Sequence, residues 1–436
     1  MPGAIATEPP EDVSTFLLDL AEAMHQVQFP SDMIESHLDA IATRFGVTVD
    51  PLLFQGFLAM ETRGAGRGLV AVRRIDFDAH WRLERVRLLV ELASQVAEGS
   101  VGLAQARGSL RAITSMHSMY PQVLVVAAYA VYSAAVAARV GGRALEMFVA
   151  GLVGIAAGVI HVGTIRYRQV DLQKSFLAGL FGMLVTLGVA HFLPPFDYAR
   201  SLFGGMTLLV PAMMIAIAAH ELANAALESG VSRLAYGALR FVLLGAGIIA
   251  AVKLWSFVAP VPPSRISEPM STAVVLAILV VGGAALTFCL QARLRDLPIM
   301  IFATLLAYGA QALSKHLLSN EEGAPAFAAF LLGAVAHLQA RFSGHVPATM
   351  VVPGLLQLAP GFMGTEGVID ALVEHTGAGA FQVILVAVQL VMGLIAASVL
   401  FDKRKPRAEK EAPTPSPTSS LSPSSMSWAR GPNRHR

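Results

Sequence analysis

Apolar residues dominate the chain from about residue 121 to residue 401, whereas the regions on either side mix apolar and polar positions. A helix needs roughly 20 mostly apolar residues to cross a membrane. Ten segments meet or approach this length, near 122–140, 145–165, 176–193, 200–220, 235–257, 270–290, 298–316, 325–340, 346–365 and 381–401. The pattern predicts an α-helical polytopic membrane protein with about ten transmembrane helices.

Ahead of the first span, the pattern predicts a small water-soluble α+β domain. Apolar residues recur at helical spacing in four segments, near 12–29, 32–45, 79–98 and 101–113. Alternation over 47–49 and 69–77 predicts strands, and the Gly-rich stretch 62–68 predicts a turn. We expect Ser31 to cap the second helix and Gly46 to end it.

These patterns divide the chain into five parts. We expect a disordered N-terminus over 1–11, the soluble domain over 12–118, membrane units over 119–258 and 268–402, and a disordered tail over 403–436. The tail contains PTPSPTSSLSPSS, a composition that cannot bury a core. The first residues, MPGAIATEPPED, have neither the basic nor the apolar region of a secretory signal.

The ten spans divide into two sets of five that share a pattern. Pro211 in the fourth span and Pro360 in the ninth lie about 150 residues apart, and other spans are offset by a similar amount. Because five is odd, two like-folded copies must enter the membrane from opposite sides. This predicts two five-helix inverted repeats, an arrangement found in many secondary transporters. The alternative is that two apolar halves align by composition alone.

The stretch VVPGLLQLAPGFMG, residues 351–364, carries Pro-Gly twice inside an apolar segment. Each backbone group freed by a break costs several kcal/mol in lipid, so breaks belong where protein or a wet cavity surrounds them. Exposed half-helix ends can then bind a carboxylate and an ammonium group. We therefore select as pathway candidates Pro211, Pro353, Gly354, Gln357, Pro360 and Gly361. A simple kink is the alternative, because Pro and Gly are common in membrane helices.

The fourth span ends in AAHELANAALESG, which places His220, Glu221 and Asn224 together. Ionisable groups inside a membrane are costly and often functional. His220 and Glu221 are therefore proton-coupling candidates and Asn224 a pathway candidate, unless all three lie at the membrane surface. A zinc protease motif would need a second His at position 224. Since that residue is Asn224, this motif is absent.

Composition supports the membrane interpretation and excludes some chemistry. Hydrophobic residues make up 55% of the chain and charged residues 14%, against about 25% charged in typical soluble proteins. The single cysteine, Cys289, excludes an intrachain disulfide and a cysteine metal cluster. The net charge of +2 does not indicate nucleic-acid binding. We predict no metal, no cofactor and no enzymatic activity.

Basic residues near the span ends predict the orientation. We assign Lys174, Arg233 and Arg240 to loops on the inner side, and the flanks add Arg107, Arg111, Lys403, Arg404, Lys405 and Arg407. Both termini are thus expected in the cytoplasm. With these residues assigned to loops, no basic pair remains in mid-span, which argues against a dianionic substrate.

Three stretches carry a resemblance to a known family. They are the soluble segment from FLLDLAEAMHQVQFPSDMIESHLDA onwards, GGMTLLVPAMMIAIAAHELANAALESGVSRL, and VPGLLQLAPGFMG. Together they resemble the threonine/serine exporter family over about residues 12–400. Pro211, Glu221, Gly230, Arg233 and Leu234 occupy places of the family pattern. Ala212 departs from it, because the family favours Gly there.

The resemblance implies a multi-pass carrier in the bacterial inner membrane that exports small hydroxy amino acids, driven by the proton-motive force. Its partners would be the amino acid, protons and the lipid bilayer, with no nucleic acid; a homo-oligomer stays open. Two other hypotheses remain. One is a membrane-anchored sensor or enzyme that acts through residues 1–115, and the other is an exporter of a different small metabolite, such as a dicarboxylate.

Overall fold

A computed structural model describes residues 9–54, 56–64, 67–75, 82–166, 173–318, 323–343, 348–358 and 378–401. By its contacts the chain divides into Met1–Phe401 and Asp402–Arg436, and all described residues belong to the first unit. The predicted disordered tail over 403–436 and most of the predicted disordered N-terminus therefore lie outside the described residues. Pro360 and Gly361 also lie outside them.

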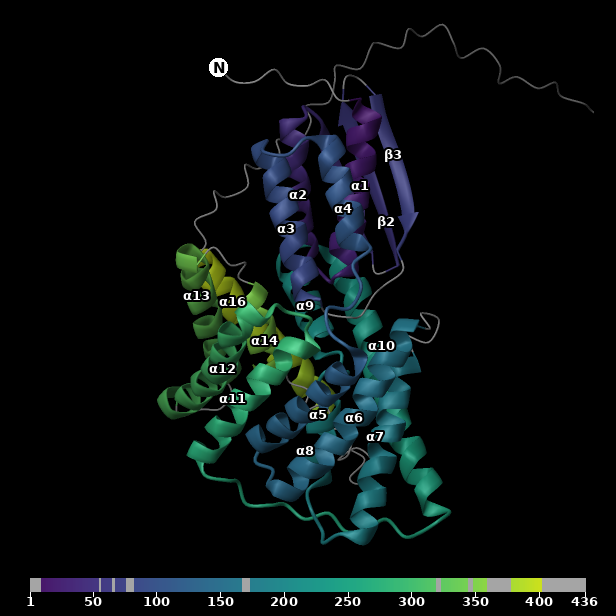
Figure 1. Ribbon diagram of the computed structural model, residues 1–436, viewed down its shortest axis with the longest axis vertical. Helices are drawn as coiled ribbons and strands as arrows, with labels where there is room; N and C mark the ends of the chain where they lie inside the picture. Colours follow the sequence, from purple (N-terminus) through teal and green to yellow (C-terminus); the bar gives the residue numbers. More distant parts are fainter. Residues whose placement is uncertain are drawn as a thin grey trace, which may run out of the picture. The chain divides into compact units, whose positions relative to one another are not determined.

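The described residues of the N-terminal domain form four helices and three strands. They are α1 (Pro10–Gln26), α2 (Ser31–Arg44), β1 (Thr48–Leu53), β2 (Phe57–Gly64), β3 (Arg67–Arg74), α3 (Leu83–Glu98) and α4 (Leu103–Thr114). The strands form one antiparallel sheet in the order β1-β2-β3. Figure 1 shows α1 to α4 beside this sheet.

The sheet corrects one prediction about this domain. The turn expected over 62–68 is shorter, since β2 continues to Gly64 and β3 begins at Arg67. Alternating burial along β2, with Leu58, Met60 and Thr62 on the inner face, extends the strand into the expected turn. Gly46 follows α2 with φ +67°, a left-handed conformation that suits glycine, so its predicted role as a helix stop is confirmed.

The core of the domain is apolar and continuous. Phe16, Leu17, Leu20 and Met24 repeat at three- and four-residue spacing on α1 and are fully buried. Matching stripes on the other helices and the inner face of the sheet pack against them. Burial of apolar surface, which contributes about 25 cal/mol per Å², is the main force that holds such a domain together.

The membrane region begins with α5. Its first half contains α5 (Gln122–Arg139), α6 (Ala144–Arg166), α7 (Gln173–Phe192), α8 (Tyr198–Met206), α9 (Ala212–Ala223) and α10 (Leu227–Ser256). Its second half contains α11 (Thr272–Cys289), the short η2 (Leu294–Asp296), α12 (Leu297–Leu318), α13 (Ala324–Ser343), α14 (Ala348–Leu358) and α16 (Ala378–Phe401).

Within the described residues, seven helices are long and apolar enough to cross a membrane. They are α5, α6, α7, α10, α11, α12 together with η2, and α13. Three shorter apolar segments, Ala212–Ala223, Thr349–Leu358 and Val388–Phe401, occupy the fourth, ninth and tenth predicted spans. The chain is therefore a largely helical, multi-pass membrane protein.

Helices pack in corresponding pairs in the two halves. In the first half α5 packs on α6, α7 on α10 and α6 on α8; in the second α11 packs on α12, α13 on α16 and α12 on α14. Figure 1 shows the two groups, blue to teal and green to yellow. The halves meet where α5 packs on α11 and α9 on α16.

The second half contradicts the predicted break at Pro353, because α14 continues through this residue to Leu358. Pro353 is the sixth residue of the helix, where an N–H would normally bond the carbonyl of Thr349. The ring removes this one hydrogen bond, yet the helix continues for a further turn to Leu358.

Candidate functional site

An interrupted helix occupies the fourth predicted span. α8 ends at Met206, and α9 begins at Ala212 with Pro211 at its N-cap. The first helical hydrogen bond of α9 runs from Ile215 N to Pro211 O at 3.1 Å. The N–H groups before it have no partner inside the helix and carry the positive end of its dipole. The predicted interruption at Pro211 is confirmed.

A cavity of about 50 Å³ lies at this interruption, enough for a few water molecules. Pro211 and the first turn of α9 form part of its wall, and Leu356 of α14 adds a residue from the second half. Six of the lining side chains carry a hydrogen-bond donor: Gln28, Tyr129, His161, Lys174, Arg240 and Cys289. The cavity thus joins elements of both membrane halves and of the N-terminal domain.

Two basic side chains meet at the cavity. Lys174 on α7 is 3% exposed and Arg240 on α10 is 5% exposed. Arg240 Nε donates to Ser175 Oγ at 3.3 Å, and both cations make further interactions within the chain. The assignment of these two residues to loops is therefore wrong, because both are buried in helices, Lys174 at the start of α7 and Arg240 within α10. Two buried cations beside a helix N-terminus make the cavity suited to a carboxylate.

Of the second-half candidates, Gln357 and Gly354 are buried but do not line the cavity. Gln357 is 1% exposed, and its Nε2 lies 3.4 Å from the Tyr132 hydroxyl of α5. A Cβ on Gly354 would lie 2.4 Å from Leu332 Cδ1, so glycine lets α14 approach α13. These residues link α14 to its neighbours, next to Leu356 on the cavity wall.

The proton-coupling candidates lie at the other end of α9. Glu221 is fully buried, and its carboxylate accepts from Arg233 Nε at 3.0 Å and Arg233 Nη2 at 3.1 Å. Gly230 allows this pairing, because a Cβ there would lie 2.7 Å from Leu222 Cγ and 3.0 Å from Leu222 N. Glycine thus brings the start of α10 against the end of α9.

The same carboxylate binds the N-terminal domain. Ser31 donates to Glu221 Oε1 twice, from its backbone N–H at 3.1 Å and its hydroxyl at 2.7 Å. Ser31 is the first residue of α2, so the carboxylate lies at a helix N-terminus, where the dipole favours a negative charge. The prediction that Ser31 caps α2 is wrong, since its hydroxyl binds Glu221 instead and Pro30 holds the N-cap position.

His220 completes this contact. Its Nε2 lies 3.2 Å from Asp32 Oδ2 on α2 and 3.1 Å from Asn224 Nδ2. Ser229 of α10 also donates to the carbonyl of Leu53 at 2.6 Å. The sequence motif around Glu221 therefore holds the N-terminal domain against α9 and α10.

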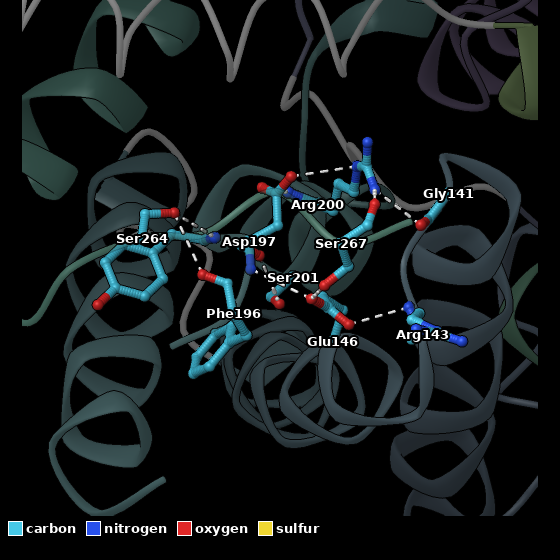
Figure 2. Close-up of polar contacts among 10 residues, drawn as sticks. Gly141, Arg143, Glu146, Phe196, Asp197, Arg200, Ser201, Ser264 and Ser267 are labelled. Atoms are coloured by element: carbon cyan, nitrogen blue, oxygen red, sulfur yellow. Dashed lines mark hydrogen bonds and ion pairs between the residues drawn. The ribbon is translucent and has the colours of Figure 1, made fainter. Parts of the chain in front are cut away.

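A second polar cluster anchors the start of α8 (Figure 2). Glu146 accepts from Arg143 N at 2.9 Å, from Asp197 N at 3.2 Å and from the Ser267 hydroxyl. Arg200 donates to the carbonyls of Gly141 and Ser267 at 2.7 and 2.6 Å. These bonds tie the α10–α11 connection to the helix that leads into the interruption.

The chain matches, over residues 15–255 and 264–401, the protein family described as "Putative threonine/serine exporter". The chain belongs to the threonine/serine exporter family. The match covers the interrupted helix and the Glu221–Arg233 pair as well as the soluble domain. Members of this exporter family are membrane transporters rather than enzymes.

Relatives of this exporter-family chain occur in yeasts. Pheromone-regulated membrane protein 10 of Saccharomyces cerevisiae is 22% identical over 299 residues, covering 66% of this chain and 76% of the relative. The protein of that name in Candida glabrata is 20% identical over 399 residues, covering 87% and 50%. The chain spans half or less of several relatives it matches. No solved structure matches this exporter-family chain.

Gln28, Lys174 and Arg240 are among the cavity residues that sequence reasoning did not select. Arg240 was assigned to a loop, although it lies in a long apolar helix two turns from Arg233. This spacing places both arginines on one face of the helix. It was the signal from which a helical position for Arg240 could have been predicted. No local pattern marks Gln28, because only the docking of the soluble domain brings it to the cavity.

Proposed function

We propose that this chain is a secondary transporter that exports small amino acids, threonine or serine, through the cavity at Pro211. The observation that carries this proposal is an interrupted helix whose first turn meets two buried cations inside a multi-pass chain of the exporter family. A carboxylate suits the two cations and the N–H groups in the first turn of α9.

We further propose ten spans arranged as two inverted five-helix repeats, over 119–258 and 268–402, behind a soluble domain over 12–118. The corresponding helix pairs support this arrangement. So do two sites of close packing: Gly247 of α10 against Phe176 of α7, and Gly393 of α16 against Ala326 of α13. Pro353, Gly354, Gln357, Pro360 and Gly361 would then belong to the second-half counterpart of the Pro211 interruption.

For the coupling proton, His220 is a better candidate than Glu221. The carboxylate of Glu221 is fully buried, and Arg233 and Ser31 already bind it. His220 is partly exposed beside Asp32 and Asn224, and an imidazole ring can both accept and donate a proton. We place both termini in the cytoplasm, at a bacterial inner membrane. The named relatives are yeast proteins, so this location rests on the basic flanks and on the family resemblance.

The experiment that tests the function is uptake of labelled serine and threonine into vesicles carrying the full chain, with and without a proton gradient. We expect gradient-dependent uptake that Arg240→Gln abolishes. Lys253→Gln is the matched control, because Lys253 lies exposed on the same helix. If the wild-type chain moves neither amino acid, the proposed function fails.

The basic pair favours one second candidate, an exporter of a dicarboxylate. Lys174 and Arg240 supply two positive charges at one cavity, which matches two carboxylates. Uptake of a labelled four-carbon dicarboxylate into the same vesicles separates the two functions.

A further inference from the structure

The loop between α1 and α2 contains an unusual glutamine. Phe29 N donates to Met24 O at 3.1 Å, and Gln28 N donates to His25 O at 3.0 Å. This pair of hydrogen bonds is the Schellman motif, which ends many helices and requires one residue in the left-handed conformation. That residue is Gln28, with φ +63°. Glycine usually holds this position because any Cβ is strained there.

The side chain of Gln28 adds a second unfavourable feature. Gln28 is 3% exposed, and its Oε1 is buried without a hydrogen-bond partner among the described residues. A buried acceptor without a partner destabilises the folded state. A strained backbone and an unsatisfied amide thus coincide at one residue, where glycine would remove both costs.

Gln28 lies at the cavity beside the interruption at Pro211. Gln28 belongs to its wall together with Pro211, Lys174 and Arg240. The docking contacts hold it there, because Ser31 and Asp32 lie just after it and bind Glu221 and His220. The residues lining the cavity thus include two cations, which attract a carboxylate, and a neutral amide, whose oxygen can accept from an ammonium or hydroxyl group.

We infer that Gln28 is a specificity-determining residue of the transport site, contributed by the N-terminal domain and accepting a hydrogen bond from the ammonium or hydroxyl group of the substrate. The soluble domain then completes the site. This inference rests on the proposed function. It also explains why a residue other than glycine occupies the left-handed position.

Three variants of the full chain test the inference in the same vesicle assay. Gln28→Gly removes the amide and relieves the backbone. Gln28→Asn keeps an amide on a residue that tolerates the left-handed conformation. Gln26→Ala is the matched control: Gln26 lies two residues before Gln28, donates to Glu22 and is not among the residues that line the cavity.

We expect Gln28→Gly to raise the KM for serine and threonine about ten- to hundred-fold, the effect of losing a hydrogen bond to a charged group. Its thermal midpoint should be equal to or above that of the wild type. Gln28→Asn should restore part of the KM, and Gln26→Ala should transport as the wild type does.

An unchanged KM in Gln28→Gly overturns the inference while leaving the proposed function intact. If Gln28→Gly has a lowered thermal midpoint and Gln28→Asn does not restore the KM, Gln28 has a structural role, and this result also overturns the inference. If the wild-type chain transports neither amino acid, the proposed function fails and the inference fails with it.

Discussion

Glu221 lies where α9, α10 and the soluble domain meet, and its contacts decide between two roles. A coupling group must release and bind a proton, whereas this carboxylate is fully buried and bound by Arg233 and Ser31. Such a pair contributes little net stability, but removing one partner leaves an uncompensated buried charge. The geometry therefore favours a structural role for Glu221.

Glu221→Gln should consequently destabilise the protein by about 3–5 kcal/mol, the cost of leaving a buried Arg without its partner. Thermal unfolding of the purified chain measures this, and protease sensitivity of the N-terminal domain reports undocking. Glu228→Gln is the control, since Glu228 is exposed at the start of α10. A Glu221→Gln protein of normal stability that has lost only its proton dependence would restore the coupling role.

His25 makes the stability of the N-terminal domain depend on pH. Burial, and secondarily the charge of Arg233, lowers the pKa of His25 from 6.5 to about 3. Between these values the unfolded chain binds a proton that the folded chain does not. With respect to His25, the free energy of unfolding is therefore highest above pH 6.5. It declines as pH falls toward 3, by up to about 1.4 kcal/mol per pH unit.

Replacing the imidazole tests this account. His25→Leu should flatten the loss of stability between pH 6.5 and 5, measured as the difference from wild type in denaturant unfolding at each pH. His117→Gln, at an exposed histidine, should leave the wild-type slope unchanged. If His25→Leu has that same slope, another group causes the dependence.

At the scale of elements, close helix packing depends on single glycines. A Cβ on Gly247 would lie 2.1 Å from the carbonyl oxygen of Phe176, and one on Gly393 would lie 2.1 Å from that of Ala326. A backbone oxygen in a helix cannot move aside as a flexible side chain can. The two contacts join α10 to α7 and α16 to α13.

Gly247→Ala and Gly393→Ala should therefore each destabilise the chain by about 1–3 kcal/mol through overpacking. Gly188→Ala and Gly309→Ala are matched controls, because nothing lies within 4 Å of their added Cβ and alanine is the better helix former. Thermal midpoints should fall in the first pair and hold or rise in the second. Equal midpoints in all four would contradict the packing argument.

The elements were predictable where one strong signal decides them. Apolar runs gave most span positions to within a few residues, and Pro211 predicted the interruption because a proline far inside an apolar run breaks hydrogen bonding. Pro353 misled, because α14 continues through it although the proline removes one helical hydrogen bond. The middle strand β2 was missed because the Gly-rich turn signal hid its alternating pattern.

The candidate site was less predictable than the elements. Pro211 could be selected from local sequence, but Gln28 and Lys174 lie far from it in the chain and reach the same cavity only through tertiary packing. Glu221 and Arg233 could be placed from the sequence at positions of the family pattern. Their role in docking depends on α2, whose first turn supplies the donors.

At the scale of the whole molecule, the proposed repeat requires an odd number of crossings between the soluble domain and the α10–α11 connection. Five predicted spans lie between them, so the two must face opposite sides of the membrane. After three further spans, the end of α13 must face the side of the soluble domain again. One cysteine at each place is enough to test this.

The single native cysteine makes the experiment simple, because Cys289→Ala provides a background free of thiols. Val70, Ile266 and Phe342 are exposed in the soluble domain, the α10–α11 connection and the end of α13. In intact cells, an impermeant maleimide should label I266C and spare V70C and F342C, while permeabilised cells should show labelling of all three. Labelling of V70C and I266C from the same side would exclude five crossings. Labelling of F342C together with I266C would exclude three crossings in the second half, and with them the antiparallel arrangement that brings α14 to the cavity at Pro211.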